Sequence, residues 1–298
     1  MAKQLKLGII GMSEGNGHPY SWSAIFNGYN TKFMKDCPFP VIPEYLSQRK
    51  FPNDGLSHLG QVTHIWTQEI KTSTHIASSS YIEHVVERKE DMIGHVDAIL
   101  LARDDGQNHV ELALPFIEAG LPLFIDKPFA LTIQDARIML KAQISEKQIF
   151  SCSSLRYAQE LQLNENEKKD IGEIIYVEGN VMKYWETYGI HILEPIVAQL
   201  PNRGRLLSIT PIKMDDMHVV VIKWENCMAN LKITGKISSS LNLKFFGTKG
   251  SIIKKFSNSF DCFKTSLETF TTQINNQTQI IPRNETLELV NIIEQGRL

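Results

Sequence analysis

Lys127 is the residue whose type and position point most directly to chemistry. It belongs to Asp126-Lys127-Pro128, directly after an apolar run at 121–125. Because proline has no N–H to donate, it ends a strand, and the lysine is expected at the carboxyl edge of a parallel sheet, where open α/β folds bind ligands. An ammonium group there can hold or protonate a substrate oxygen. The plainer alternative is a solvated lysine at a strand end.

His191 is a second candidate for proton transfer. It lies in Tyr188-Gly189-Ile190-His191-Ile192-Leu193-Glu194, three residues before Glu194 and on the same face of an expected helix. An imidazole can accept the proton of a reacting alcohol. A histidine among isoleucines and leucines is more often a core residue, so the catalytic interpretation requires that it meets Lys127 in one cleft.

A glycine-rich turn follows the first apolar strand. Its candidate phosphate-binding residues are Gly11, Ser13, Gly15, Asn16, Gly17 and His18. Glycines at this place let backbone N–H groups approach a pyrophosphate at a helix N-terminus. The spacing departs from G-x-G-x-x-G, since Ser13 stands at the second glycine position and the loop is longer. Glu14 adds an unfavourable charge, so a glycine-rich connection without a ligand is the alternative.

The ends of neighbouring strands complete the expected cofactor site. Gln68 or Glu69 could bind ribose hydroxyls at the end of the second strand. No arginine follows closely, so the sequence slightly favours NAD over NADP. His109 is either a cap near the cofactor or an ordinary helix-start residue. The other residues expected to border the cofactor are Thr67, Ala102, Arg103, Asp126 and Lys127. The histidines and cysteines show no metal-ligand spacing, so no metal is expected.

Hydrophobic periodicity supplies a scaffold for these groups. The first part of the chain alternates apolar runs with helix-period segments, which is typical of a parallel α/β sheet. The expected strands are 5–10, 62–67, 96–102, 121–125 and 149–153, and the expected helices are 20–28, 78–88, 109–119 and 131–145. Residues 35–61 hold four prolines and are expected to be an irregular insertion with one short helix at 44–48.

The pattern changes after about residue 170. Short strand-like runs occur at 174–181, 206–212, 218–224, 229–234 and 241–246, with helices at 188–199 and 285–294. They predict a mostly antiparallel open sheet. The fold class is therefore α/β, with an N-terminal Rossmann-type doubly wound parallel sheet and a C-terminal α+β domain. The expected domains are 1–128 for the dinucleotide and 129–298 for substrate binding and oligomerisation.

Bulk composition narrows the function classes. The 298 residues carry a net charge of −2, which argues against nucleic-acid binding and electrostatic docking to a membrane. No apolar stretch approaches the roughly 20 residues needed to cross a bilayer. The first strand begins too early to leave room for a signal peptide. Together with four scattered cysteines, these features predict a reduced cytoplasmic protein.

The chain resembles the Gfo/Idh/MocA (glucose–fructose oxidoreductase / inositol dehydrogenase / MocA) family of NAD(P)-dependent oxidoreductases. The matching segments are GIIGM at 8–12, VDAILLA at 96–102, NHVELALPFIEAGLPLFIDKPFALT at 108–132, YGIHILEPI at 188–196, GTKGSI at 247–252 and ETLELVNIIE at 285–294. The resemblance implies a sugar, cyclic polyol or sugar-nucleotide substrate, and an open sheet that often builds the oligomer interface. Lys127 and His191 would correspond to the family's catalytic lysine and histidine. The family often has an aspartate where this chain has Thr187.

These observations predict an NAD(P)-dependent oxidoreductase of CH–OH groups that works as a homodimer or homotetramer. His191 would remove the hydroxyl proton while Lys127 holds the same oxygen. The residues expected on the substrate side are Arg156, Tyr157, Tyr184, Glu186, Thr187 and His191, and Arg156 would suit a carboxylate or phosphate. The alternatives are a catalytically degenerate relative acting as a sugar-derivative sensor or scaffold, and a lyase or epimerase that retains NAD.

Overall fold

The computed structural model describes residues 4–297, which form two compact units. Within that range, unit 1 comprises residues 4–130, 134–151 and 263–283, and unit 2 comprises residues 131–133, 152–262 and 284–297. Residues 134–151 and 263–283 follow residue 128 in the chain and yet belong to unit 1. The assignment of a separate role to residues 1–128 and 129–298 remains a prediction.

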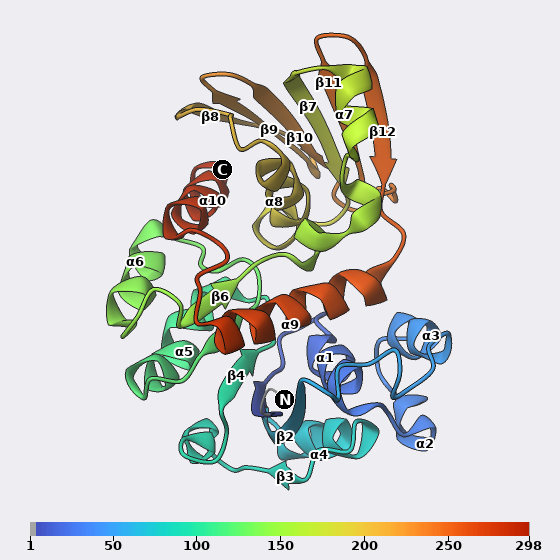
Figure 1. The fold of residues 1–298 in the computed structure, drawn as a ribbon, viewed down its shortest axis with the longest axis vertical. Helices are drawn as coiled ribbons and strands as arrows, with labels where there is room; N and C mark the ends of the chain where they lie inside the picture. The colour runs from blue at the N-terminus through green and yellow to red at the C-terminus, as the bar shows by residue number, and fades with distance from the viewer. Residues whose placement is uncertain (1–3, 298) are drawn as a thin grey trace. The chain divides into compact units, whose positions relative to one another are not determined.

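Unit 1 is built on a six-stranded parallel sheet (Figure 1). Its strands are β1 Leu5–Ile10, β2 Gly60–Trp66, β3 His84–Val85, β4 Ala98–Leu101, β5 Leu123–Ile125 and β6 Ile149–Ser151, in the order β3-β2-β1-β4-β5-β6. This order reverses between β1 and β4, and open sheets bind ligands at such a point. The predicted Rossmann-type sheet is confirmed.

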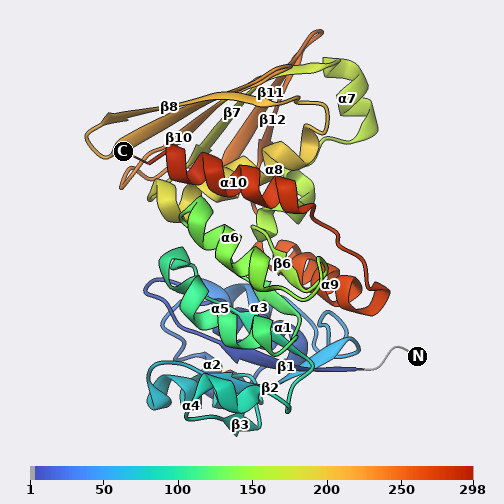
Figure 2. The same cartoon turned by 90° about the vertical axis from the view of Figure 1, so that its left-hand side faces the viewer.

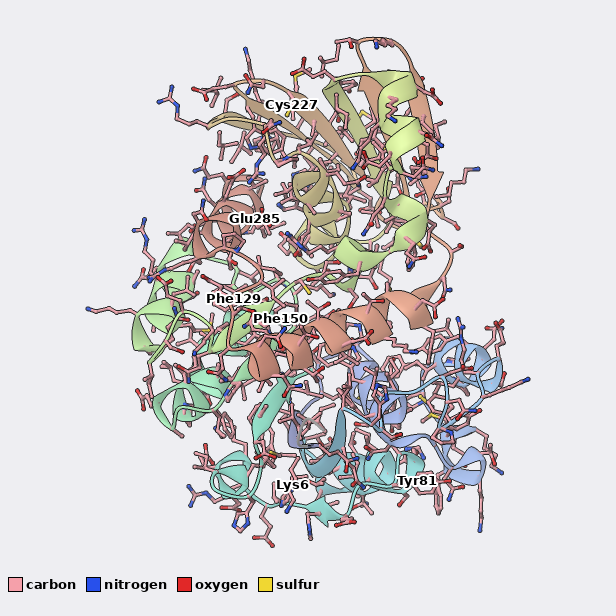
Figure 3. All side chains as sticks on the ribbon, viewed as in Figure 1. Lys6, Tyr81, Phe129, Phe150, Cys227 and Glu285 are labelled. Carbon is pink, nitrogen blue, oxygen red and sulfur yellow. The ribbon has the colours of Figure 1, made fainter. Side chains whose placement is uncertain are left out.

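The helices that belong mainly to unit 1 are α1 His18–Asn27, α2 Thr31–Met34, α3 Val41–Ser47, α4 Ile70–Ser79, α5 His109–Glu118, α6 Ile133–Ala142 and α9 Ser259–Asn276. Aromatic side chains fill the space between the sheet and two of these helices. Trp22 of α1 stacks on Phe124 of β5 with 4.7 Å between the ring centroids. The ring of Phe150 in β6, labelled in Figure 3, lies 5.9 Å from the ring of Phe270 in α9. Such large apolar contacts dominate core stability.

Three elements of unit 1 differ from what the sequence predicted. The helix predicted at 78–88 is wrong, because α4 covers 70–79 and residues 84–85 form β3. Pairing of Ile65 with Val85 in the sheet outweighs the helical spacing of the apolar residues around Val85. Helix α9 was not predicted, since its sequence is rich in Ser, Thr and Asn, which have low helix propensity. In the insertion, the short helix α3 begins earlier than predicted, with Pro43 in its first turn.

Unit 2 contains a second six-stranded sheet, in the order β12-β11-β7-β10-β9-β8. The strands are β7 Ile174–Val181, β8 Leu206–Met214, β9 Met217–Trp224, β10 Met228–Ile233, β11 Asn242–Gly247 and β12 Ser251–Lys255. Only β7 and β10 pair in parallel among these neighbours, so the predicted mostly antiparallel sheet is confirmed. Strand β12 was not predicted.

Three helices belong mainly to unit 2, namely α7 Glu165–Ile171, α8 Ile190–Gln199 and α10 Arg283–Gln295. Helix α7, which was not predicted, starts at a capping box of Asn164 and Glu167. Helices α8 and α10 lie on one face of the sheet (Figure 2), and the core beneath them includes Leu193, Val220 and Phe245.

The other face of this sheet carries exposed apolar side chains. Ile212 and Met214 of β8 are 54% and 67% exposed, and they stand opposite Val219 and Met217 of β9. Ile253 of β12 is 54% exposed on the same face. Among the described residues of unit 2, no helix lies over this face (Figure 2). Separately, within residues 4–297 no helix is both long and apolar enough to cross a membrane.

Candidate active site

The glycine turn of unit 1 packs tightly between β1 and α1. The N–H of Gly11 donates to the carbonyl of Trp66 at 3.0 Å, and a Cβ on Gly11 would lie 2.4 Å from Cγ of Pro19. Only glycine therefore allows this approach of strand and helix. Gly15 has φ +74°, which favours glycine, and nothing lies within 4 Å of where its Cβ would be. The chain thus leaves open space over Gly15.

Gln68 fastens this turn to the end of β2. Its side-chain Nε2 donates to the carbonyl of Met12, and its Oε1 accepts from the Met12 N–H, both at 3.0 Å. A pocket of ≈ 250 Å³ lies beside this pair, lined by Met12, Ser13, Glu14, Thr67, Gln68, Glu69 and Thr72. In a doubly wound fold this is the side on which a ribose hydroxyl meets a carboxylate.

Asp126 connects the start of α1 to the end of β5. Its Oδ2 accepts from Asn16 Nδ2 at 3.1 Å and lies 2.5 Å from Nδ1 of His18. The His18 ring also stacks on Trp22, with 5.2 Å between ring centroids. The other oxygen of Asp126 accepts the N–H of Lys127 at 2.8 Å. One buried carboxylate thus holds both the turn and the backbone of the candidate catalytic lysine.

Lys127 is buried, and its ammonium Nζ lies 3.3 Å from Oδ2 of Asp104. Oδ1 of Asp104 accepts from Ser13 Oγ at 2.6 Å. Burial alone would raise the pKa of Asp104, but the ammonium of Lys127 and the hydrogen bond from Ser13 outweigh it and lower that pKa. Asp104 therefore stays ionised beside the lysine.

Four of the predicted cofactor residues have local roles in the fold. The hydroxyl of Thr67 bonds to Ser73 at 2.9 Å, and the guanidinium of Arg103 pairs with Asp105 at 2.5 Å. The ring nitrogens of His109 each lie 3.0 Å from a backbone carbonyl, and Ala102 donates its N–H to Ile10. The structure gathers the turn residues, Asp126 and Lys127 around one sheet edge, with Glu69 in the adjacent pocket.

These features fit a dinucleotide. The turn precedes a helix N-terminus, the place where phosphates bind, and the space over Gly15 gives them access. Glu14 is exposed and borders the same pocket as Glu69. Two carboxylates there suit ribose hydroxyls and disfavour an added 2′-phosphate, because like charges repel.

His191 belongs to unit 2, near the start of α8. Its Nδ1 lies 2.8 Å from Oγ of Ser153, and its ring meets that of Tyr188 edge to face at 5.1 Å. The N–H of Leu155 donates to the same Ser153 oxygen at 3.2 Å. Ser153 therefore sets the orientation of the imidazole, a role that nothing in the sequence motif indicated.

A buried ionic network lies behind Ser153. Its N–H donates to Glu194 Oε2 at 2.6 Å, and Arg156 Nη1 lies 3.4 Å from Glu194 Oε1 and 2.7 Å from Glu285 Oε1. Burial raises the pKa of Glu194 to about 7 against the opposing pull of Arg156. Arg156 loses solvation in the same way, but Glu194 and Glu285 raise its pKa overall. The arginine that was predicted to meet a substrate anion is thus paired with two carboxylates of its own unit.

The other predicted substrate residues lie on short helical segments of unit 2. Tyr157 ends the 3-10 helix Ser154–Tyr157, and Glu186 and Thr187 belong to the π-helix Trp185–Gly189 that precedes α8. Tyr184 is 60% exposed just before that segment. Thr187 and Tyr188 therefore adjoin His191 along the chain, while Arg156 and Tyr157 follow Ser153.

Two polar residues of these clusters were missed. Asp104 follows β4, whose carboxyl end lies at the same sheet edge as that of β5, so the strand-end rule that selected Lys127 also selects Asp104. Ser153 follows β6 by two residues and is the N-cap of a 3-10 helix, which is a common structural use of serine. Its contact with His191 depends on tertiary structure alone.

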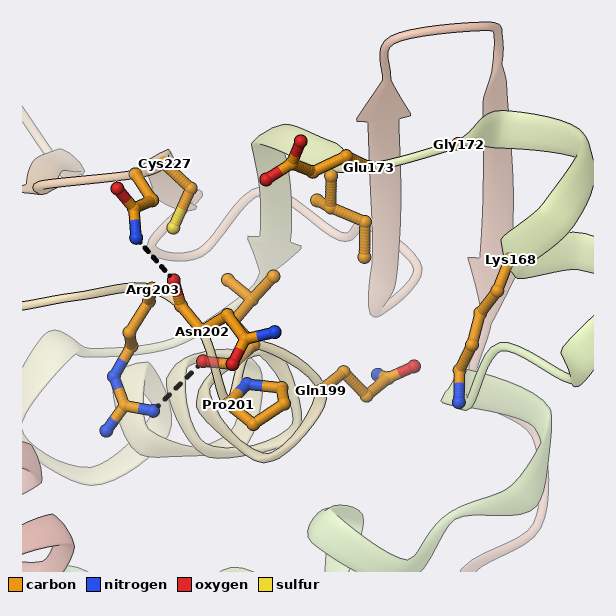
Figure 4. A pocket seen from close by; sticks show the side chains of 11 residues that line it. Lys168, Gly172, Glu173, Gln199, Pro201, Asn202, Arg203 and Cys227 are labelled. Atoms are coloured by element: carbon orange, nitrogen blue, oxygen red, sulfur yellow. Dashed lines mark hydrogen bonds between the residues drawn. The ribbon is translucent and has the colours of Figure 1, made fainter.

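A second pocket, of ≈ 280 Å³, belongs to unit 2 and lies at the far end of α8 from His191 (Figure 4). Its wall includes Lys168, Glu173, Gln199 and Cys227. Arg203 caps the helix there, donating to the carbonyl of Leu200 at 3.1 Å. Within residues 4–297, no group of three or more His, Cys, Asp or Glu side chains is arranged to hold a metal ion.

The comparisons with known proteins agree with this fold. Residues 41–154 match the Gfo/Idh/MocA model, described as an oxidoreductase family with an NAD-binding Rossmann fold. This stretch of the chain is therefore similar to the Gfo/Idh/MocA family. No sequence among curated proteins matches it.

Solved structures of the same fold cover nearly the whole chain. Myo-inositol 2-dehydrogenase from Lactobacillus plantarum has a TM-score of 0.70 at 14% identity, covering 99% of this chain and 96% of that one. Myo-inositol dehydrogenase from Corynebacterium glutamicum gives 0.72 at 14%, covering 99% and 96%. Levoglucosan dehydrogenase, in complex with NADH and L-sorbose, gives 0.74 at 13%, covering 99% and 97%. At these identities the likeness concerns the fold.

Proposed function

We propose that this protein is an NAD(P)-dependent oxidoreductase of the Gfo/Idh/MocA family, which oxidises a hydroxyl group, or reduces the matching ketone, on a sugar, cyclic polyol or sugar nucleotide. The observation that carries the proposal is the buried Lys127 ammonium, held by Asp104 at the sheet edge beside the glycine turn. Solved structures of the same fold include inositol and levoglucosan dehydrogenases, which supports this substrate class.

Each side chain has a distinct role in this proposal. A nicotinamide cofactor held by the glycine turn would supply the hydride acceptor for the substrate carbon. His191 accepts the hydroxyl proton through Nε2, because its Nδ1 faces Ser153. Lys127 donates a hydrogen bond to the reacting oxygen and so stabilises its developing negative charge. Glu14 and Glu69 at the ribose side favour NAD over NADP.

The proposed assembly is a homodimer or homotetramer formed through the open face of the unit 2 sheet. That face carries Ile212, Met214 and Ile253, all more than half exposed. Ile212 and Met214 lie on the edge strand β8, and Ile253 lies on the opposite edge strand β12. Exposed apolar side chains on a sheet face that no helix covers are typical of an interaction site, and closed symmetric pairing would cover this face.

Cofactor binding comes first in the test of this function. NADH and NADPH are titrated while tryptophan fluorescence is followed, because Trp22 stacks on His18 in the turn. Tighter binding of NADH is expected. Absence of binding at millimolar concentrations of both would reject the oxidoreductase and leave the sensor or scaffold. Cofactor retained through purification without net turnover would indicate the lyase or epimerase instead.

Turnover of sugars, polyols and sugar nucleotides is then measured in wild type, Lys127→Met, His191→Asn and the double variant. Each single change should lower kcat/KM by about 10²–10⁴-fold. Exposed Lys71→Met and His58→Asn serve as matched controls and should retain wild-type rates. If both groups act on one oxygen, the double variant should lose less than the product of the single losses. Wild-type rates in both single variants would remove Lys127 and His191 from the mechanism.

A further inference from the structure

Lys127 has an enclosed position that a solvated strand-end lysine would not have. Its side chain is only 4% exposed, and the Asp104 carboxylate lies at 3.3 Å. Burying an ammonium is strongly unfavourable unless a charged or hydrogen-bonding partner offsets the lost hydration. Asp104 supplies that partner from the same unit.

Asp104 is itself oriented by the glycine turn. Its backbone N–H donates to Ser13 Oγ at 3.1 Å, and Ser13 Oγ donates to its Oδ1 at 2.6 Å. The carboxylate therefore has one oxygen on the turn and the other on the lysine. Because both bonds fix the plane of the carboxylate, the position of the Lys127 ammonium depends on where Ser13 lies.

The chain lacks the aspartate that the family often places four residues before the histidine, since Thr187 stands there. Within unit 2, the contact made by Nδ1 of His191 is with the neutral hydroxyl of Ser153. The carboxylate paired with a proposed catalytic cation is instead Asp104, which follows β4 of unit 1.

We propose that Asp104 is a positioning residue that keeps Lys127 as an ammonium ion and couples it to the cofactor turn through Ser13. Lys127 then serves as a hydrogen-bond donor to the substrate oxygen, and His191 alone exchanges the proton. This inference rests on the proposed function. The inference also predicts that a ligand bound to the turn changes the environment of the Lys127 ammonium. Ser13 is part of the turn and also bonds to Asp104, which pairs with Lys127.

The pH profile of kcat/KM tests the proposal. Asp104→Asn keeps the size and the acceptor for Ser13 but removes the charge beside Lys127. The rate at neutral pH should fall about 10–100-fold, and the alkaline limb should move to lower pH by about one unit or more, because an ammonium that loses an adjacent carboxylate gives up its proton more easily. Asp104→Glu should return the alkaline limb of the pH profile to its wild-type position, even where kcat/KM stays low.

Asp105→Asn is the matched control, since Asp105 lies in the same loop and pairs with Arg103. It removes the same charge next to Asp104 and should leave the alkaline limb where it is. Ser13→Ala keeps the ion pair between Asp104 and Lys127 but breaks its link to the turn. NADH should then no longer alter the NMR signal of the Lys127 side-chain amine. An unmoved limb in Asp104→Asn, or an equal shift in Asp105→Asn, would overturn the positioning role.

A readout independent of turnover separates this inference from the proposed function. The side-chain amine of Lys127 is followed by NMR in ¹⁵N,¹³C-lysine-labelled protein and assigned with Lys127→Arg. Its proton should be lost at lower pH in Asp104→Asn than in wild type. If no substrate is turned over, the oxidoreductase proposal fails while this titration still decides the ion pair. Identical titrations in wild type and Asp104→Asn would refute it.

Discussion

Glu194 is a fully buried carboxyl group three residues after His191, and its protonation is linked to folding. Burial raises its pKa from an ordinary 4.5 to about 7, although Arg156 and the N–H of Ser153 favour the charged form. The folded state thus binds the proton more tightly than the unfolded state. The stabilisation is complete below pH 4.5 and is lost as the pH rises through about 7.

Glu194→Gln should therefore reduce the loss of stability that occurs as the pH rises through about 7. The amide keeps an acceptor for Ser153 and does not titrate, while Arg156 retains Glu285 at 2.7 Å. Between pH 5 and 8 the free energy of unfolding of the wild type should fall by on the order of 3 kcal/mol because of Glu194. In the variant it should fall by less. Thermal unfolding at several pH values measures the difference. Exposed Glu165→Gln is the control, and a variant that parallels the wild type would contradict the linkage.

At the residue scale, the sequence correctly placed Lys127 at the end of a buried strand, while its catalytic role stays a prediction. Lys127 was found because a proline follows an apolar strand, and the strand end fixes where the lysine lies. Ser153 was missed, because its contact with His191 joins residues 38 apart in the chain. Arg156 was predicted to face a substrate anion, since a sequence does not reveal which carboxylates a buried guanidinium will meet.

At the scale of elements, β3 is the weak edge of the unit 1 sheet. It has only two residues, and its His84 pairs with His64 of β2. The rings of His84 and His64 lie 4.5 Å apart, and the ring of His95 lies 5.9 Å from that of His64. Burial, then His84, His95 and Lys6, lower the pKa of His64, while Glu83 opposes them. Asp91 also borders this surface hollow. Because its pKa is lowered in the folded state, neutral His64 is favoured on folding. This stabilisation is present above the ordinary pKa of 6.5 and is lost as the pH falls.

His84→Asn should make the protein less sensitive to acid. Removing the imidazole of His84 removes one of the groups that oppose protonation of His64. The melting temperature at pH 5 should rise by about 1–2 °C relative to wild type, with little change at pH 8. His58→Asn, outside this stack, provides the control. A melting temperature that shifts equally at both pH values would show that packing and not protonation is responsible.

Elements with strong hydrophobic periodicity were predicted well, including β7, whose bounds at 174–181 agree with the structure. Prediction failed where tertiary contacts decide. Residues 84–85 form a strand only because β2 offers an edge, and α9 is helical because one face packs Phe270 against Phe124 at 5.7 Å. Its polar composition gives no such indication.

At the scale of the whole molecule, the open face of the unit 2 sheet predicts self-association. Ile212→Lys combined with Met214→Lys places two charges on this face without touching the buried side of β8. Light scattering after size exclusion should find a dimer or tetramer for the wild type and a monomer for the variant. Ile144→Lys is the control, since Ile144 is 72% exposed in unit 1. A monomeric wild type at about 50 µM, where interfaces of ordinary size are occupied, would reject the assembly.

Gln68, Ser13, Asn16 and His18 hold the glycine turn in place through hydrogen bonds within the protein itself. The turn therefore loses its conformational freedom when the chain folds and has little left to lose when a ligand arrives. Association should then proceed at a rate set by diffusion and charge and not by slow rearrangement of the loop.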